Sequence, residues 1–156
     1  MDKDKLLWLL VAALLIIGTG TGIYIMARGI RNNNPGNIRH GASKWQGMSA
    51  EQTDKEYIQF DDPIYGIRAM AKLLQNYESR YGLNTIRGLI SRWAPPNENI
   101  TSAYIASVSQ KLDVSPDQKI NVREVMAPLV TAIIIHENGM QPYSEALITE
   151  GIARAS

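Results

Sequence analysis

One acidic residue, Glu137, stands at the end of an almost wholly apolar run. Residues 129–135 are apolar apart from a single threonine, and His136 and Glu137 follow them directly. A helix over this run would place the Glu137 carboxyl in its last turn, where the helix dipole and low-dielectric surroundings both disfavour ionisation. We therefore predict a raised pKa for Glu137, as a general acid needs in glycoside hydrolysis. The alternative is a helix-end carboxylate that faces water.

The elements that must position Glu137 are predicted to be mainly α-helical. Apolar residues at helical spacing predict five helices, over Pro63 to Tyr77, Asn84 to Trp93, Thr101 to Leu112, from between Asn121 and Pro128 to Asn138, and from Ser144 to about Ala153. The stretch 31–49 is rich in Asn, Gly and Ser and predicts a structured loop. Residues 57–60 alternate in polarity and predict a short strand or an extended segment.

The N-terminal residues 6–27 contain no charged side chain. At about 1.5 Å per residue, a helix over them would be roughly 33 Å long, which spans a bilayer. We therefore predict an uncleaved transmembrane signal anchor over residues 1–27, because the run is longer than a signal-peptide core and lacks a small-x-small cleavage site. The spacing of Gly18 and Gly22 could allow self-association in the membrane, although small residues are also ordinary in membrane helices.

Composition argues against several classes of function. The 156 residues include 16 basic and 15 acidic side chains, so the chain lacks the cationic field of a nucleic-acid binder. Cysteine is absent and the two histidines are too few for an all-histidine zinc site. The acidic residues between 54 and 62 lack the ligand spacing of a calcium loop. We predict no metal, no cofactor and no nucleic-acid partner.

Two motifs resemble enzymes that cut bacterial cell walls. Residues 132–142, AIIIHENGMQP, resemble the catalytic-glutamate signature of lytic transglycosylases and related lysozyme-like glycosidases, with Asn138 where that family has serine. Residues 34–38, NPGNI, and the WQG at 45–47 resemble a region of flagellar-type and autolysin glucosaminidases, which follows the glutamate helix there and precedes it here. A circular permutation would reconcile the two orders. The soluble part as a whole also resembles small bacteriophage and prophage proteins thought to degrade peptidoglycan.

The resemblance implies a small lysozyme-like helical catalytic domain over residues 28–156, with further residues around the acid. Glu98 is the candidate second carboxylate, although an acid at the start of a helix also suits the helix dipole. Asn34 and Asn37 could bind glycan N-acetyl and hydroxyl groups, or only their own turn. Aromatic residues that could contact the sugar or steady the transition state, or else fill the core, are Trp45, Tyr65, Tyr104 and Tyr143.

The function implied is a membrane-anchored peptidoglycan glycosidase, used in phage entry or host lysis. Glu137 would protonate the glycosidic oxygen between N-acetylmuramic acid and N-acetylglucosamine. A lytic transglycosylase would use this one carboxyl as acid and then base, whereas a hydrolase needs a second carboxylate, for which Glu98 is the first choice. The expected partners are glycan strands and, through residues 6–27, the lipid bilayer of the host inner membrane or virion, with the domain facing the periplasm or cell wall. The alternatives are a non-catalytic virion or membrane structural protein that binds cell wall, and a peptidoglycan endopeptidase on the same scaffold.

Overall fold

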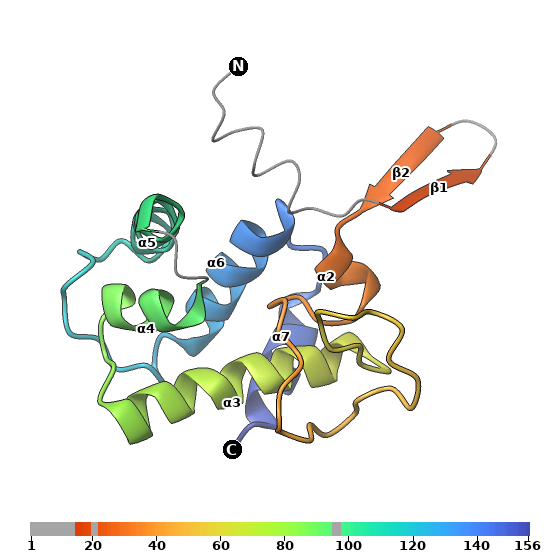
Figure 1. Cartoon of the computed structure of the whole chain (residues 1–156). Helices are drawn as coiled ribbons and strands as arrows, with labels where there is room; N and C mark the ends of the chain where they lie inside the picture. The colour runs from red at the N-terminus through yellow and green to blue at the C-terminus, as the bar shows by residue number, and fades with distance from the viewer. Residues whose placement is uncertain (1–14, 20–21, 95–97) are drawn as a thin grey trace.

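A computed structural model describes residues 15–19, 22–94 and 98–156 of the chain. Over these residues it has six helices and one two-stranded hairpin, which projects from the helical body beside α2 (Figure 1). The elements in chain order are β1 (Leu15–Thr19), β2 (Gly22–Met26), α2 (Arg28–Arg31), α3 (Pro63–Tyr81), α4 (Ile86–Trp93), α5 (Glu98–Leu112), α6 (Met126–Asn138) and α7 (Glu145–Ala153). The predicted mainly α class is confirmed.

The longest helix, α3, begins and ends at residues suited to those positions. The side chain of Asp62 accepts a hydrogen bond from the backbone N–H of Ile64, and Pro63 occupies the first helical position, where its missing N–H costs nothing. Gly82 then ends the helix in the left-handed conformation, with φ of 65°. The helix predicted from Pro63 is therefore confirmed and runs a turn further than Tyr77.

The other predicted helices are also present, with small differences in where they begin. Thr85, not Asn84, caps α4, because its hydroxyl accepts a hydrogen bond from the backbone of the third residue of that helix. Helix α5 begins at Glu98 and not at Thr101. Ser144 caps α7 as predicted. The short helix α2 was not predicted, because its four residues are too few to show helical periodicity.

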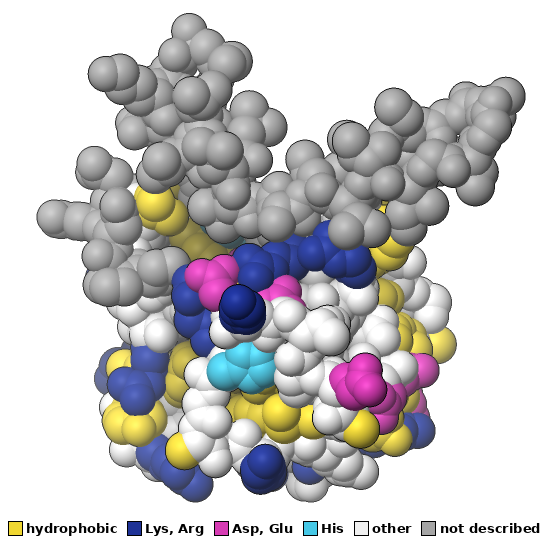
Figure 2. All heavy atoms as spheres, turned by 45° about the vertical axis from the view of Figure 1, so that its right-hand side comes forward, with side chains coloured by type: hydrophobic (Ala, Val, Ile, Leu, Met, Phe, Trp, Pro, Cys, Tyr) yellow, Lys and Arg dark blue, Asp and Glu magenta, His cyan; other side chains and the backbone are white. Residues whose placement is uncertain are grey.

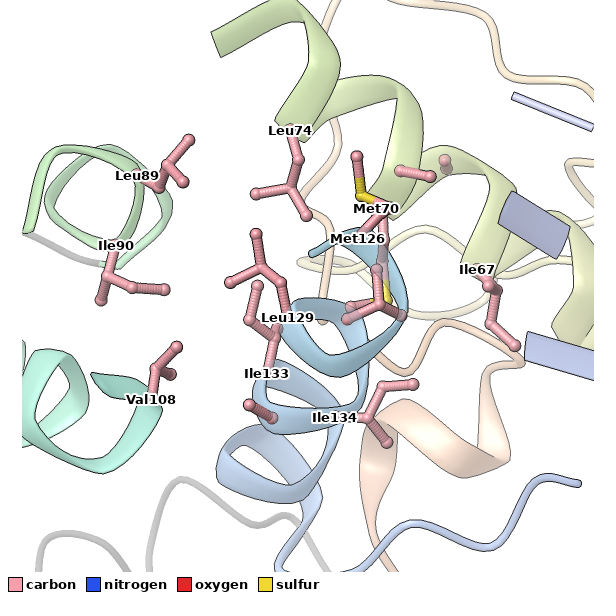
Figure 3. Close-up of a cluster of buried hydrophobic side chains, with 14 of the residues drawn as sticks. Ile67, Met70, Leu74, Leu89, Ile90, Val108, Met126, Leu129, Ile133 and Ile134 are labelled. Atoms are coloured by element: carbon pink, nitrogen blue, oxygen red, sulfur yellow. The ribbon is translucent and has the colours of Figure 1, made fainter. Parts of the chain in front are cut away.

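Helix α6 is the central helix of the domain and packs against α2, α3, α5 and α7. Leu129 and Ile133 point toward buried side chains of the neighbouring helices, Leu74 in α3, Leu89 in α4 and Val108 in α5 (Figure 3). Each fully buried side chain of this size contributes roughly 1.5–3 kcal/mol to folding. The end of α6 is thereby held in a fixed place relative to the other helices.

The transmembrane helix predicted over residues 6–27 is wrong. Where the structure describes this stretch, β1 and β2 form an antiparallel pair in which Gly18 lies opposite Ile23 and Thr19 opposite Gly22. Residues 6–14 and the pair 20–21 lie outside the described residues. Of the helices that the structure describes, none has both the length and the apolar character needed to cross a bilayer.

The error has a physical reason, since a charge-free run does not by itself distinguish a helix from apolar strands. Residues 15–26 are rich in Ile and Thr, whose β-branched side chains favour strands, and contain three glycines, which disfavour a helix interior. In the hairpin Gly18 and Gly22 do not mark one face of a helix. The single-pass membrane localisation was inferred from this run and is corrected with it.

Residues 32–62 form a long loop that is held by hydrogen bonds. Isolated bridges pair Arg39 with Tyr57 and Met48 with Phe60. Residues 57–60 are therefore extended, which was one of the two structures predicted for them. The backbone N–H of Phe60 also donates to the carbonyl of Asn32 at 2.9 Å, so the two ends of the loop meet.

Arg28 in α2 anchors this loop through Asp54. Its Nε and Nη2 donate to the two oxygens of Asp54, each at 2.6 Å, and its Nη1 donates to Glu56 at 2.7 Å. Asn32 and the backbone N–H of Tyr57 also donate to the Asp54 carboxylate. The hydrogen bonds from Arg28 are the main reason that the pKa of Asp54 lies far below its usual range. Figure 2 shows acidic and basic side chains intermixed on one face of the molecule.

We expect Asp54→Asn to lower the free energy of unfolding at pH 7 by about 2–3 kcal/mol, because an amide cannot accept both charge-assisted hydrogen bonds from Arg28. The folded-state pKa of Asp54 lies below its unfolded value of about 3.9, so this stabilisation is present above pH 4 and is lost as the pH falls. Urea unfolding between pH 7 and pH 3 should show that the difference in free energy of unfolding between the wild type and Asp54→Asn becomes smaller as the pH falls.

The control is Asp117→Asn, which breaks an exposed pair with Arg87 of similar two-pronged geometry and should cost little stability. If the difference in free energy of unfolding between the wild type and Asp54→Asn did not change with pH, the ion pair with Arg28 would not be what holds the loop.

Candidate active site around Glu137

Glu137 lies in the last turn of α6, as predicted. Gly139 ends the helix two residues later, with φ of 73°, and its N–H returns to the carbonyl of Ile135. The Glu137 side chain is partly buried. Glu137 is therefore not the freely exposed residue that was the alternative.

Two neutral donors from distant parts of the chain hold the carboxyl group. The hydroxyl of Tyr104, in α5, donates to Glu137 Oε1 at 2.8 Å. The side-chain amide of Asn37, in the loop after α2, donates to Oε2 at 2.9 Å. Each carboxyl oxygen has its own partner, so the orientation of the group is fixed. The structure thus brings together three of the residues that the sequence singled out.

Burial raises the pKa of Glu137 above its ordinary value. The hydrogen bonds from Asn37 and Tyr104 act in the opposite direction because they favour the carboxylate. The nearby Trp93 side chain and the charge of Arg39 also lower the pKa. Burial is the larger effect, and the net direction is the one predicted. Trp93 was not among the site residues predicted from the sequence, where it stands only as the last residue of a predicted helix.

Asn37 is positioned by a loop that Asn34 holds together. The Asn34 amide donates to the carbonyls of Ile38 and Ile58 at 2.9 and 2.8 Å, and its oxygen accepts from Ile38 N at 2.9 Å. Asn34 is fully buried, so it serves the loop and is not open to a sugar. Asn37 itself has φ of 49°, a left-handed conformation that asparagine tolerates, and this conformation directs its side chain to α6.

Tyr104 is positioned by His136, the residue before the acid. The two rings stack with their centroids 3.6 Å apart and an angle of 14° between their planes. Burial, with a smaller effect of Lys111, lowers the pKa of His136 to about 4, so the imidazole is neutral at pH 7. Burial and the charge of Glu137 raise the pKa of Tyr104 well above its ordinary value, so the hydroxyl remains a hydrogen-bond donor.

Asn138 and Gly29 join the loop to the end of α6. Asn138 donates from Nδ2 to the carbonyls of Pro35 and Ile134, at 2.8 and 2.9 Å. A Cβ atom on Gly29 would lie 2.5 Å from Asn138 Oδ1 and 2.7 Å from Asn37 Oδ1. Only a residue without a side chain allows α2 to approach the two amides this closely, and sequence analysis had no signal for this contact.

The remaining predicted site residues are placed differently. Trp45 and Tyr143 pack against the hydrophobic core, and burial raises the pKa of Tyr143 to about 12. The Tyr65 ring lies against the backbone of Gly47, where a Cβ atom would be 2.1 Å from the ring. In the part of the chain that the structure describes, none of these three hydrogen-bonds Glu137. The side chain of Glu98 lies outside the described residues, although its backbone begins α5.

A groove with a volume of about 330 Å³ lies elsewhere, between α6 and α7. Glu137 does not line this groove. The lining residues are Ala127, Pro128, Thr131, Gln141, Glu145, Ile148 and Thr149. Within residues 15–19, 22–94 and 98–156, no group of three His, Asp or Glu side chains is placed to hold a metal ion. The Glu137 carboxyl, with a neutral hydrogen-bond donor on each oxygen and a raised pKa, is a group that could donate a proton.

We expect Gly29→Ala to lower the free energy of unfolding by roughly 1–3 kcal/mol, because the added methyl group must displace Asn37 and Asn138. The side-chain amide signal of Asn37 in an NMR spectrum should shift at the same time. Gly41→Ala is the control, because a Cβ atom there would meet no atom within 4 Å. A Gly29→Ala protein as stable as the wild type, with an unchanged Asn37 signal, would show that this close approach does not hold the site.

Comparison with known proteins places the chain in a family. No protein-family model matches it. Over 154 residues it is 39% identical to protein P5 of Pseudoalteromonas phage PM2, and the aligned region covers 97% of this chain and 96% of that protein. This phage relative supports a bacteriophage origin. Because the identity extends over nearly the whole of both chains, the protein belongs to the family of protein P5 of phage PM2.

Proposed function

We propose that the protein is a glycosidase that cuts the glycan strands of peptidoglycan with Glu137 as its general acid. The observation that carries the proposal is the state of the Glu137 carboxyl, which is partly buried, held on both oxygens by neutral donors and raised in pKa. A group of this kind keeps its proton closer to neutral pH than an ordinary glutamate does, and it is fixed in direction. The motif at residues 132–142, which resembles the glutamate signature of lytic transglycosylases, supports the same assignment.

The residues around the carboxyl fit the steps of such a reaction. Glu137 gives its proton to the glycosidic oxygen, and the bond from that oxygen to the anomeric carbon of N-acetylmuramic acid breaks with its electron pair on the oxygen. Asn37 and Tyr104 then donate hydrogen bonds to the carboxylate that remains, which limits the cost of a buried charge. Both are positioning residues for the acid in this scheme.

Two completions of the reaction are chemically balanced. In a lytic transglycosylase, the 6-hydroxyl oxygen of the same muramoyl residue bonds to the anomeric carbon and its proton returns to Glu137, with no water consumed. In a hydrolase, water supplies that oxygen and a second carboxylate assists, for which Glu98 remains the candidate. The two completions leave different ends on the glycan, so product analysis separates them.

A bacteriophage origin is compatible with the proposed role at the cell wall. A phage must breach peptidoglycan when it enters its host and again when its progeny leave, and an enzyme that cuts glycan strands serves either step. A phage origin therefore fits the chemistry proposed for Glu137. The enzyme would act either during phage entry or during host lysis.

The test is clearing of purified peptidoglycan by the wild-type protein, Glu137→Gln and a control, Glu124→Gln, which changes an exposed carboxylate bonded to Asn121. Loss of a general acid typically costs 10²–10⁴-fold in rate, so we expect clearing by the wild type and the control and almost none by Glu137→Gln. Mass spectrometry should then find anhydro-muropeptides or new reducing ends.

Equal clearing by wild type and Glu137→Gln would remove Glu137 from the mechanism. No clearing by any of the three would favour a non-catalytic protein that binds the wall, and products cut only in their peptide stems would identify an endopeptidase.

A further inference from the structure

Arg92, in the last turn of α4, lies over the faces of two tyrosine rings of α3. Its guanidinium carbon is 3.6 Å from the ring centroid of Tyr81 and 5.2 Å from that of Tyr77. The two tyrosines are four residues apart and so share one side of their helix. The face of an aromatic ring attracts a guanidinium without using its N–H donors, which remain able to bind another group.

The outward N–H groups of Arg92 have no carboxylate partner in the described structure. The ion pairs among the described residues use Arg28, Arg39, Arg87 and Arg154. Arg92 is exposed, and Tyr81 beneath it retains 53% of its surface in contact with solvent, which is high for a large aromatic side chain. The arrangement therefore presents a fixed positive charge on an aromatic base.

Contacts between aromatic rings lead from Arg92 toward the site around Glu137. The ring of Tyr77 meets the ring of Trp93 edge to face, with the centroids 6.4 Å apart and an angle of 70° between the planes. The Trp93 side chain in turn lies close enough to the Glu137 carboxyl to lower its pKa. Two aromatic side chains, Tyr77 and Trp93, thus lie between Arg92 and the candidate acid.

Resting on the proposed function, we infer that Arg92 with Tyr77 and Tyr81 forms a substrate subsite that binds the carboxylates of the peptide stems on a glycan strand. Peptidoglycan differs from neutral glycans by the acidic peptides attached to its muramoyl residues. The planar fork of a guanidinium matches a carboxylate with two parallel hydrogen bonds, which a neutral sugar cannot supply. The exposed ring of Tyr81 offers an apolar face to the sugar beside it.

The test is binding, measured by calorimetry with the full chain and two soluble probes. One probe is a disaccharide-tetrapeptide from peptidoglycan, and the other is a neutral tetramer of N-acetylglucosamine. The proteins carry Glu137→Gln so that the probes are not cut. We expect Arg92→Gln to weaken binding of the peptide-bearing probe roughly tenfold and to leave binding of the neutral probe unchanged.

Arg123→Gln removes an exposed arginine at another place on the surface and is the charge-matched control, expected to change neither affinity. The subsite is rejected if Arg92→Gln weakens both probes equally, weakens neither, or weakens the peptide-bearing probe no more than the control does. The subsite is also rejected if the protein that retains Arg92 does not bind the peptide-bearing probe. Wall clearing by the wild-type protein would still support the glycosidase proposal in each case, so the two failures are distinguishable.

Discussion

The Glu137 site depends on placing a carboxyl group at the end of a buried helix, where ionisation is disfavoured. Helix α6 occupies the centre of the domain because its side chains pack against those of the neighbouring helices. That packing carries Glu137 out of bulk water and raises its pKa. The same packing means that the carboxyl group requires hydrogen-bond partners, since a buried polar group without one lowers the stability of the fold. The hydroxyl of Tyr104 and the amide of Asn37 meet this need without adding a charge.

The partners are themselves held by interactions that reach well beyond the site. Asn37 depends on the amide of Asn34 within the loop, and the loop is anchored to α2 by the contacts of Arg28 with Asp54. Tyr104 depends on the ring of His136, whose burial keeps it neutral. A general acid requires this kind of support, because a proton donor must be held in both position and direction. The glycosidase proposal rests on this supported geometry together with the likeness of the glutamate motif to lytic transglycosylases.

Local sequence signals predicted the helices well and predicted long-range contacts poorly. The apolar run before Glu137 and Gly139 after it were sufficient to place α6 and the acid at its end, because periodicity and a glycine stop are local properties. The pairing of Glu137 with Asn37 joins residues 100 positions apart, and nothing in the spacing of either residue indicates it. Asn34 was grouped with Asn37 as a possible sugar ligand because both are turn asparagines, and only burial distinguishes their roles. The N-terminal run was misassigned because its lack of charge outweighed its glycine and β-branched content.

The most direct measurement is the titration of the Glu137 carboxyl carbon by ¹³C NMR, with the signal assigned by its absence from Glu137→Gln. We expect a midpoint above 4.5, the ordinary pKa of this group, with the signal moving downfield as the carboxyl group loses its proton within the folded protein. A midpoint at or below 4.5 in the folded protein would mean that the hydrogen bonds of Asn37 and Tyr104 outweigh burial, and it would contradict the assignment of Glu137 as a proton donor.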